Sequence, residues 1–259
     1  MRIAMSVLAA ALAGCGGGAS TVEETILPRH AYFPGDPTIR WVEFGASVEE
    51  RAIFKAEFGS GDDVTLVIGG FHGSEPSSAY VALRLAEFLA YQPGALKAGK
   101  RVVLVPILNP DGFVRKERRN ARGVDLNRNW PTENWGQRPP RREVYAGPEA
   151  ASEPETKALM KLLETAPPGR IISIHAPLAQ NNYDGPGGEK LARLMARFNR
   201  YPVTGYIGYP TPGSFGTWAG IERKIPMVTL EVDKREAAGG EFEKLWDENR
   251  AALMAVIND

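Results

Sequence analysis

Apolar segments with almost no alternating polar residue recur along this chain, and helical patterns separate them. Segments 64–70 and 101–108 are the clearest, and such runs are typical of strands covered on both faces. Further strands are predicted at 41–44, 52–58, 171–175, 204–206 and 227–232. Helices are predicted at 77–91, 189–201, 241–257 and from a capping box at Ser152 and Glu155 to about residue 164. This alternation predicts an α/β fold with helices on both faces of the sheet.

Length and charge limit the function classes. The chain has 259 residues, of which 43% are hydrophobic, and this is ample for the core of one large domain. Lys plus Arg number 31 and so do Asp plus Glu. This charge balance offers no overall field to attract nucleic acid.

The first residues predict a targeting segment that is not part of the fold. Arg2 precedes a short apolar stretch that ends at Leu12-Ala-Gly-Cys15, which resembles the lipobox of bacterial lipoprotein signal peptides. We therefore expect a signal peptide at 1–14, a lipidated Cys15 and tether at 15–31, and a globular domain at 32–259. Cys15 is the only cysteine, so no intramolecular disulfide can form. The expected location is the bacterial cell envelope, lipid-anchored and extracytoplasmic.

Two of the three histidines follow predicted strands. His72-Gly-Ser-Glu75 comes after 64–70, and His175 ends 171–175. Ligands gather at the carboxyl ends of strands in such sheets. Two His and one Glu form a ligand set of catalytic zinc sites, with one position open for water.

Two further motifs lie between these ligands. Asn109-Pro-Asp-Gly112 alone predicts a turn. The segment from Arg118 to Trp130 is rich in Arg and Asn. It fits either a solvated basic loop or a carboxylate-binding loop, because Arg and Asn both donate to carboxylates.

Five ordered motifs resemble the zinc carboxypeptidase family. They are His72-Gly-Ser-Glu75, Asn109-Pro-Asp-Gly112, Gly123-Val-Asp-Leu-Asn-Arg-Asn129, Ser173-Ile-His175 and Val228-Thr-Leu-Glu231. The resemblance implies a single zinc-carboxypeptidase-like domain with a mixed, twisted central sheet. It also implies that His72, Glu75 and His175 bind one zinc ion, and that Glu231 is the general base acting on the zinc-bound water.

The resemblance implies further roles in the basic segment. Arg118 matches the arginine that stabilises the oxyanion, and Asn127 and Arg128 match the pair that binds the free carboxylate of the substrate. Asp125 is expected to orient a ligand imidazole. Tyr209 is the candidate for the mobile capping tyrosine, with a packing role as the alternative. Phe215 lies where the family has its pocket-floor residue.

Several segments resemble the murein-peptide amidase subgroup, which cuts between γ-D-glutamate and meso-diaminopimelate in peptidoglycan peptides. They are 173–178, 183–186 and 209–215. For this bipolar substrate we expect Asp184 to meet the ammonium group and Arg141 or Arg142 the second carboxylate.

Other functions remain open at this stage. One is a carboxypeptidase of ordinary C-terminal residues, and another is a lipoprotein that binds wall peptides without cutting them. A deacylase of small acylated amino acids could use similar ligands. Glu231 could instead be a structural carboxylate paired with Lys234 or Arg235.

Overall fold

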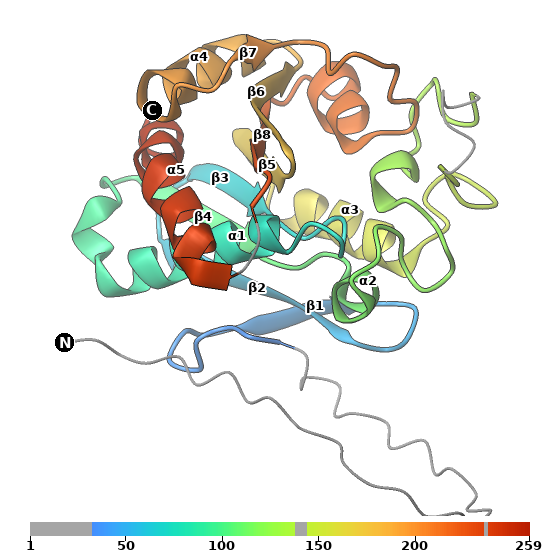
Figure 1. Cartoon of the computed structure of the whole chain (residues 1–259), viewed down its shortest axis with the longest axis horizontal. Helices are drawn as coiled ribbons and strands as arrows, with labels where there is room; N and C mark the ends of the chain where they lie inside the picture. Colours follow the sequence, from blue (N-terminus) through green and yellow to red (C-terminus); the bar gives the residue numbers. More distant parts are fainter. Residues whose placement is uncertain (1–32, 138–143, 236–237) are drawn as a thin grey trace, which may run out of the picture.

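Eight strands form one sheet in the order β1-β2-β4-β3-β5-β8-β6-β7 (Figure 1). The structure is a computed structural model that describes residues 33–137, 144–235 and 238–259. The central strands β4, β3, β5 and β8 are parallel, and antiparallel pairing occurs toward both edges. The predicted mixed sheet is therefore confirmed. The strands are β1 (Val42–Ala46), β2 (Ala52–Gly59), β3 (Asp63–Ile68), β4 (Lys100–Val105), β5 (Arg170–His175), β6 (Leu178–Asp184), β7 (Val203–Thr204) and β8 (Met227–Asp233).

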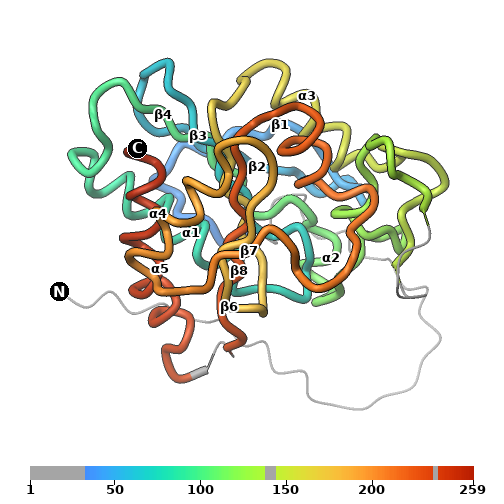
Figure 2. Tube along the Cα trace, turned by 90° about the horizontal axis from the view of Figure 1, so that it is seen from above, coloured from blue at the N-terminus to red at the C-terminus, as the bar shows by residue number. Residues whose placement is uncertain are grey.

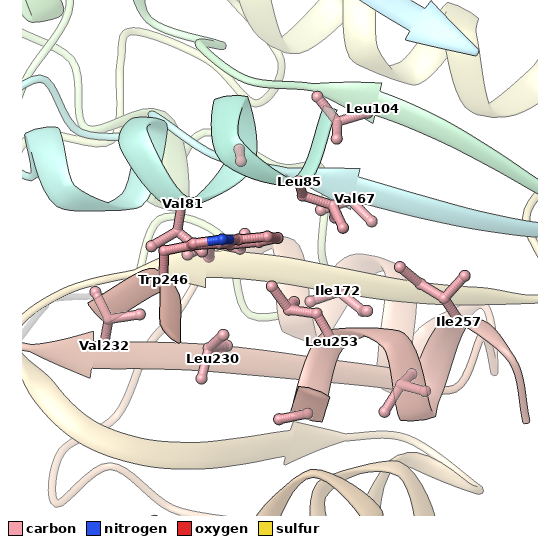
Figure 3. Packing of buried hydrophobic residues seen from close by; sticks show 14 of the residues in the cluster. Val67, Val81, Leu85, Leu104, Ile172, Leu230, Val232, Trp246, Leu253 and Ile257 are labelled. Atoms are coloured by element: carbon pink, nitrogen blue, oxygen red, sulfur yellow. The ribbon is translucent and has the colours of Figure 1, made fainter. Parts of the chain in front are cut away.

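Helices cover both faces of this sheet, as the sequence predicts. They are α1 (Pro76–Tyr91), α2 (Pro110–Arg115), α3 (Pro154–Thr165), α4 (Gly188–Asn199) and α5 (Glu241–Ile257). Successive residues of β4 alternate between two cores: Leu104 packs with α1 and α5, and Val103 packs with α3. Figure 3 shows the first core, where Trp246 and Leu253 of α5 meet residues of β5 and β8.

The second face carries the segments that later build the site. Residues of α3, the segment around Trp130 and the segment around Phe215 share one apolar cluster. The Trp130 amide donates to the Gly213 carbonyl at 3.0 Å. Figure 2 shows the green segment near residue 130 and the orange segment near residue 215 on the same side of the molecule.

Several local expectations need correction. The predicted capping box at Ser152 is wrong, because Glu153 is the N-cap of α3 and the Ser152 hydroxyl donates to the Glu153 side chain at 2.7 Å. The Asn109 motif starts α2, with Asn109 Oδ1 accepting from the Gly112 amide at 2.9 Å. Strand β6 is absent from the predicted strands because polar residues dominate it. Each helix in the described part of the chain is too short or too polar to span a bilayer.

Candidate active site

The carboxyl ends of the parallel strands bring the predicted ligands together. His72 follows β3, and His175 is the last residue of β5. The potential ligand atoms of His72, Glu75 and His175 all lie within 4.8 Å of one another. Glu75 Oε1 lies 2.8 Å from His72 Nδ1, and Glu75 Oε2 lies 3.2 Å from His175 Nδ1. All three residues are buried.

A close backbone approach shapes the loop that carries His72 and Glu75. A Cβ on Gly73 would lie 1.9 Å from the backbone of Gly112, at the start of α2. The Asn109 amide also donates to the Phe71 carbonyl at 3.2 Å. The Asn109 motif therefore holds the ligand loop in place, and only glycine fits at position 73.

Asp125 orients one of the ligand imidazoles, as predicted. Its Oδ1 lies 3.1 Å from His72 Nε2, and its Oδ2 accepts from Arg118 Nε at 3.0 Å. Burial alone would raise the pKa of Asp125, but the charges of His72 and Arg118 outweigh it and lower the pKa. Because Nε2 contacts a carboxylate, Nδ1 of His72 is available to bind a metal. Metal-binding histidines usually have such a partner on their second ring nitrogen.

Burial and charge also act on the Glu75 carboxylate. Burial favours its neutral form, but the neighbouring charge of His72 and hydrogen bonds from His175 and His72 outweigh that effect and lower the pKa of Glu75. The carboxylate is therefore ionised at neutral pH, as a metal ligand must be.

Strand pairing arranges the cavity wall in rows across β5, β8 and β6. In the first row, His175 pairs with Glu231, and Glu231 pairs with Gln180. The second row consists of Ser173, Thr229 and Asn182, and the third contains Met227 and Asp184. Directly opposite residues project from the same face of a sheet. Except for Gln180, all these residues line one cavity of about 350 Å³.

The predicted carboxylate-binding residues line the same cavity. Asn127 Oδ1 accepts from the Phe215 amide at 2.9 Å, which leaves the Asn127 NH2 group as the donor toward the cavity. Arg128 Nη1 donates to the Asn127 carbonyl at 2.6 Å, and its buried Nε has no partner among the described residues. Burial lowers the pKa of Arg128, and the charge of Asp125, followed by a hydrogen bond with the Tyr209 side chain, opposes that effect.

Arg118 lines the cavity and contacts Glu75, one of the three candidate metal ligands. Its Nη1 donates to Glu75 Oε1 at 3.1 Å, while its Nε donates to Asp125. Its side chain is 42% exposed, so one side of the guanidinium remains open to the cavity. Burial would lower the pKa of Arg118, but the two carboxylates outweigh it and raise the pKa.

Glu231 makes no structural ion pair with the nearby basic residues among those described. Arg235 pairs instead with Glu248 at 2.7 Å. The Leu178 backbone amide donates to the Glu231 carboxylate, but Oε2 is buried with no hydrogen-bond partner in the described part of the chain. Burial raises the pKa of Glu231, and the charge of Glu75 adds to this effect.

Phe215 lies beneath the cavity and not in its wall. It is 1% exposed, and its ring centroid lies 4.6 Å from Trp130 and 5.5 Å from Phe71. Phe71 in turn stacks on His175 at 5.3 Å. Phe215 thus supports a ligand histidine through packing, while its neighbours in sequence, Ser214 and Gly216, line the cavity.

Asp184 lines the cavity in the third row, two rows away from His175 and Glu231. A Cβ on Gly216 would lie 2.3 Å from Asp184 Oδ2, so glycine leaves room for this carboxylate. Burial raises the pKa of Asp184 to about 6, and no charged group among the described residues offsets the burial. The other specificity candidates, Arg141 and Arg142, lie outside the described residues, and so does Cys15.

Comparisons with known proteins agree with this geometry. The sequence model of the family described as zinc carboxypeptidase matches residues 36–184, more than half of the chain. The chain belongs to the zinc carboxypeptidase family. This membership supports a metallopeptidase-type hydrolase.

Several members of the zinc carboxypeptidase family are similar to this chain. Murein peptide amidase A of Vibrio campbellii is 35% identical over 179 residues, which are 64% of this chain and 68% of that protein. Murein peptide amidase A of Escherichia coli K12 is 37% identical over 177 residues, which are 64% of this chain and 69% of that protein. The crystal structure of murein-tripeptide amidase from Escherichia coli O157 matches with a TM-score of 0.72 at 26% identity, covering 90% of this chain and 96% of that one.

The residues of the cluster fit the zinc ion that this family implies. Two imidazoles and one carboxylate are a known ligand set of catalytic zinc sites, which keep a fourth position for water. Here both Nδ1 atoms face the Glu75 carboxylate, and Asp125 occupies the other nitrogen of His72. The cluster therefore has the donor types, the spacing and the supporting contact that zinc requires.

Proposed function

We propose that this protein is a zinc peptidase that hydrolyses the γ-D-glutamyl-meso-diaminopimelate bond of peptidoglycan peptides. The observation that carries the proposal is one cavity lined by the three candidate zinc ligands and, two rows farther along β6 and β8, by the Asp184 carboxylate. The relatives named murein peptide amidase A support the same substrate class.

His72, Glu75 and His175 would hold the zinc ion in this proposal. When bound, zinc lowers the pKa of a water ligand toward neutrality and polarises a carbonyl group. Glu231, beside His175 in the first row of the cavity wall, is the chain's candidate for general base. Its carboxylate would take a proton from the attacking water and later donate it to the leaving amine.

The other side chains of the cavity would position the substrate. Asn127 offers its NH2 group and Arg128 its guanidinium to the free carboxylate next to the scissile bond. Arg118, at the cavity edge, would donate to the oxyanion, a type of contact worth about 3 kcal/mol. Tyr209 already contacts Arg128, so a substrate carboxylate would replace its hydroxyl and release it to cover the substrate.

The depth of the cavity matches a long, charged side chain. Asp184 pairs with Met227, four residues before Glu231 on β8, which is about 13 Å along the strand. A short or purely apolar side chain would leave the Asp184 carboxylate buried without a partner, which costs free energy. Diaminopimelate carries an ammonium group at the end of its side chain and can reach this depth.

Product analysis tests the proposed function. Purified, zinc-loaded protein is incubated with L-Ala-γ-D-Glu-meso-diaminopimelate, and mass spectrometry identifies the products. We expect free diaminopimelate and L-Ala-γ-D-Glu, with turnover lowered by 10²- to 10⁴-fold in Glu231→Gln while zinc stays bound. Release of ordinary C-terminal residues from α-linked peptides, with this tripeptide intact, would instead support a general carboxypeptidase. Binding of the tripeptide without cleavage would support a wall-peptide-binding protein.

We also propose that the protein is anchored by lipid at Cys15 and faces the cell-wall compartment. The lipobox-like segment before Cys15 supports this location, and an anchored enzyme there would meet its substrate directly. Cys15→Ser should move the protein from the membrane fraction to the soluble fraction without reducing hydrolysis. Complete retention of the variant in membranes would contradict the anchor.

A further inference from the structure

Gln180 is the one member of the first row that does not line the cavity, and its amide has an unusual environment. The row runs from His175 on β5 through Glu231 on β8 to Gln180 on β6. Leu178, Asn182 and Asp184, spaced by two residues on β6, line the cavity, so Gln180 belongs to the same face. Directly opposite residues on antiparallel strands have Cβ atoms about 4.5–5.5 Å apart. Gln180 is therefore the cross-strand neighbour of Glu231.

Each side chain of this pair contains a buried polar atom without a partner. Gln180 Nε2 and Glu231 Oε2 both lack a hydrogen bond to any described residue. The next two amides of β6 are satisfied: Asn181 Nδ2 donates to Asn199 Oδ1 at 3.0 Å, and Asn182 Nδ2 donates to the Thr204 carbonyl at 3.0 Å. A donor and an acceptor thus remain unmatched on directly opposed residues, and burial without a partner is costly for both.

The two atoms match in chemistry as well as in position. A carboxylate accepts and an amide NH2 group donates, and the spacing of directly opposite residues lies within the reach of two long side chains. Among the described residues, the Leu178 backbone amide is a hydrogen-bond donor to the Glu231 carboxylate. One donor leaves the terminal torsion of a glutamate free, because that torsion is intrinsically broad. A second donor on Oε2 would fix the plane of the carboxylate.

We infer that Gln180 is a positioning residue that donates its side-chain amide to Glu231 Oε2 and orients this carboxylate for proton transfer. The inference rests on the proposed role of Glu231 as general base. Gln180 does not line the cavity, so its contribution would be made through the Glu231 carboxylate. It should therefore affect the rate of the chemical step and leave substrate binding unchanged.

Gln180→Met tests this inference, because methionine keeps the length of the side chain and removes the donor. We expect kcat to fall about tenfold, as for a lost hydrogen bond to a charged group, with KM within twofold of the wild-type value. Gln180→Glu should lower kcat further, since it places a second carboxylate beside Glu231. Gln92→Met, the same substitution at an exposed position after α1, is the matched control and should keep wild-type kinetics. Zinc stoichiometry and the thermal midpoint are measured for every variant.

A double-mutant comparison separates positioning from general damage. In the Glu231→Gln background, Gln180→Met should cause no further loss of kcat, because its effect passes through the ionised carboxylate. An equal tenfold loss in both backgrounds, or a rise in KM with unchanged kcat, would overturn the inference. Wild-type kcat in Gln180→Met, with Glu231→Gln inactive, would overturn the role of Gln180 and leave the proposed function intact. Activity in Glu231→Gln would instead contradict the proposed mechanism.

Discussion

Asp184→Asn should make the protein more stable and less selective at the same time. The substitution keeps the shape of the side chain and removes its charge. Burial raises the pKa of Asp184 from 3.8 to about 6. A carboxyl group with a raised pKa in the folded state stabilises that state below its unfolded pKa, and this contribution is lost as the pH rises through the folded pKa.

The size of the stability effect follows from that pKa difference. A shift of about 2 pKa units corresponds to about 3 kcal/mol at 1.36 kcal/mol per unit. At pH 8, Asp184→Asn should therefore raise the free energy of unfolding by up to about 3 kcal/mol. At pH 4 the two proteins should be almost equally stable. Urea denaturation at both pH values measures this difference.

Asp184→Asn should lower the selectivity for a charged side chain, although it raises the stability of the protein. Two γ-D-Glu tripeptides that end in lysine or norleucine differ by a terminal ammonium group. Loss of the partner of a buried charge costs about 2 kcal/mol or more, or roughly 30-fold in kcat/KM. Asp184→Asn should therefore lower kcat/KM for the lysine peptide, and for the diaminopimelate peptide, by about 30-fold. The norleucine peptide should be hydrolysed as well as before.

The pH dependence of the selectivity provides an independent check. In the substrate-free wild-type protein at pH 5, about a tenth of the Asp184 side chains would be ionised, because the pKa is about 6. The ratio of kcat/KM between lysine and norleucine peptides should therefore rise about tenfold from pH 5 to pH 7.5, because titrations of the catalytic groups cancel in the ratio. The variant should have a flat ratio. An equal effect of Asp184→Asn on both peptides, or lower stability at pH 8, would refute this reasoning.

Three further substitutions test the support of the site. Asp125→Asn removes the charge beside His72 Nε2 and should weaken zinc binding by about 10- to 100-fold in competition with a chromogenic chelator; unchanged affinity would contradict the orienting role. Gly73→Ala places a Cβ 1.9 Å from the backbone of α2, so it should lower both zinc content and the free energy of unfolding, the latter by about 2 kcal/mol or more. Asn120→Ala removes the amide that donates to the buried carboxylates of Glu153 and Glu155, so it should lower the free energy of unfolding by about 3 kcal/mol in urea denaturation. A loss below about 1 kcal/mol would mean that other groups satisfy these carboxylates.

The candidate metal ligands His72, Glu75 and His175 and most of the strands were predictable from the sequence. Continuous apolar runs define the buried strands because both faces of these strands are covered. His72 follows one such run, and His175 and Glu231 lie at the ends of two others, so all three were expected at the carboxyl edge of the sheet. That they share one site was implied by the family resemblance, and the strand order brings them together. Motif order then identified the family, which the sequence comparison confirmed.

Strand β6 was not predictable in the same way. One of its faces lines the cavity with Asn182 and Asp184, and the other carries Asn181 in a buried amide network with Asn199. Both faces therefore carry buried or cavity-lining polar residues, and a pattern of alternating hydrophobicity does not appear. The position of Phe215 also escaped prediction, because motif spacing does not reveal which side chain points into a cavity and which packs beneath it.

The sequence by itself determined the family of this protein and the side chains offered to the site: two imidazoles and a carboxylate that could bind a metal, and a further carboxylate, Glu231. Tertiary structure decided the register of β5, β8 and β6, and with it the rows that place Gln180 opposite Glu231 and Asp184 opposite Met227. The physical reason is that ligand types and periodicity are local properties of the chain. Register is decided when strands distant in sequence pair, and a shift of one residue would turn every one of these side chains to the other face.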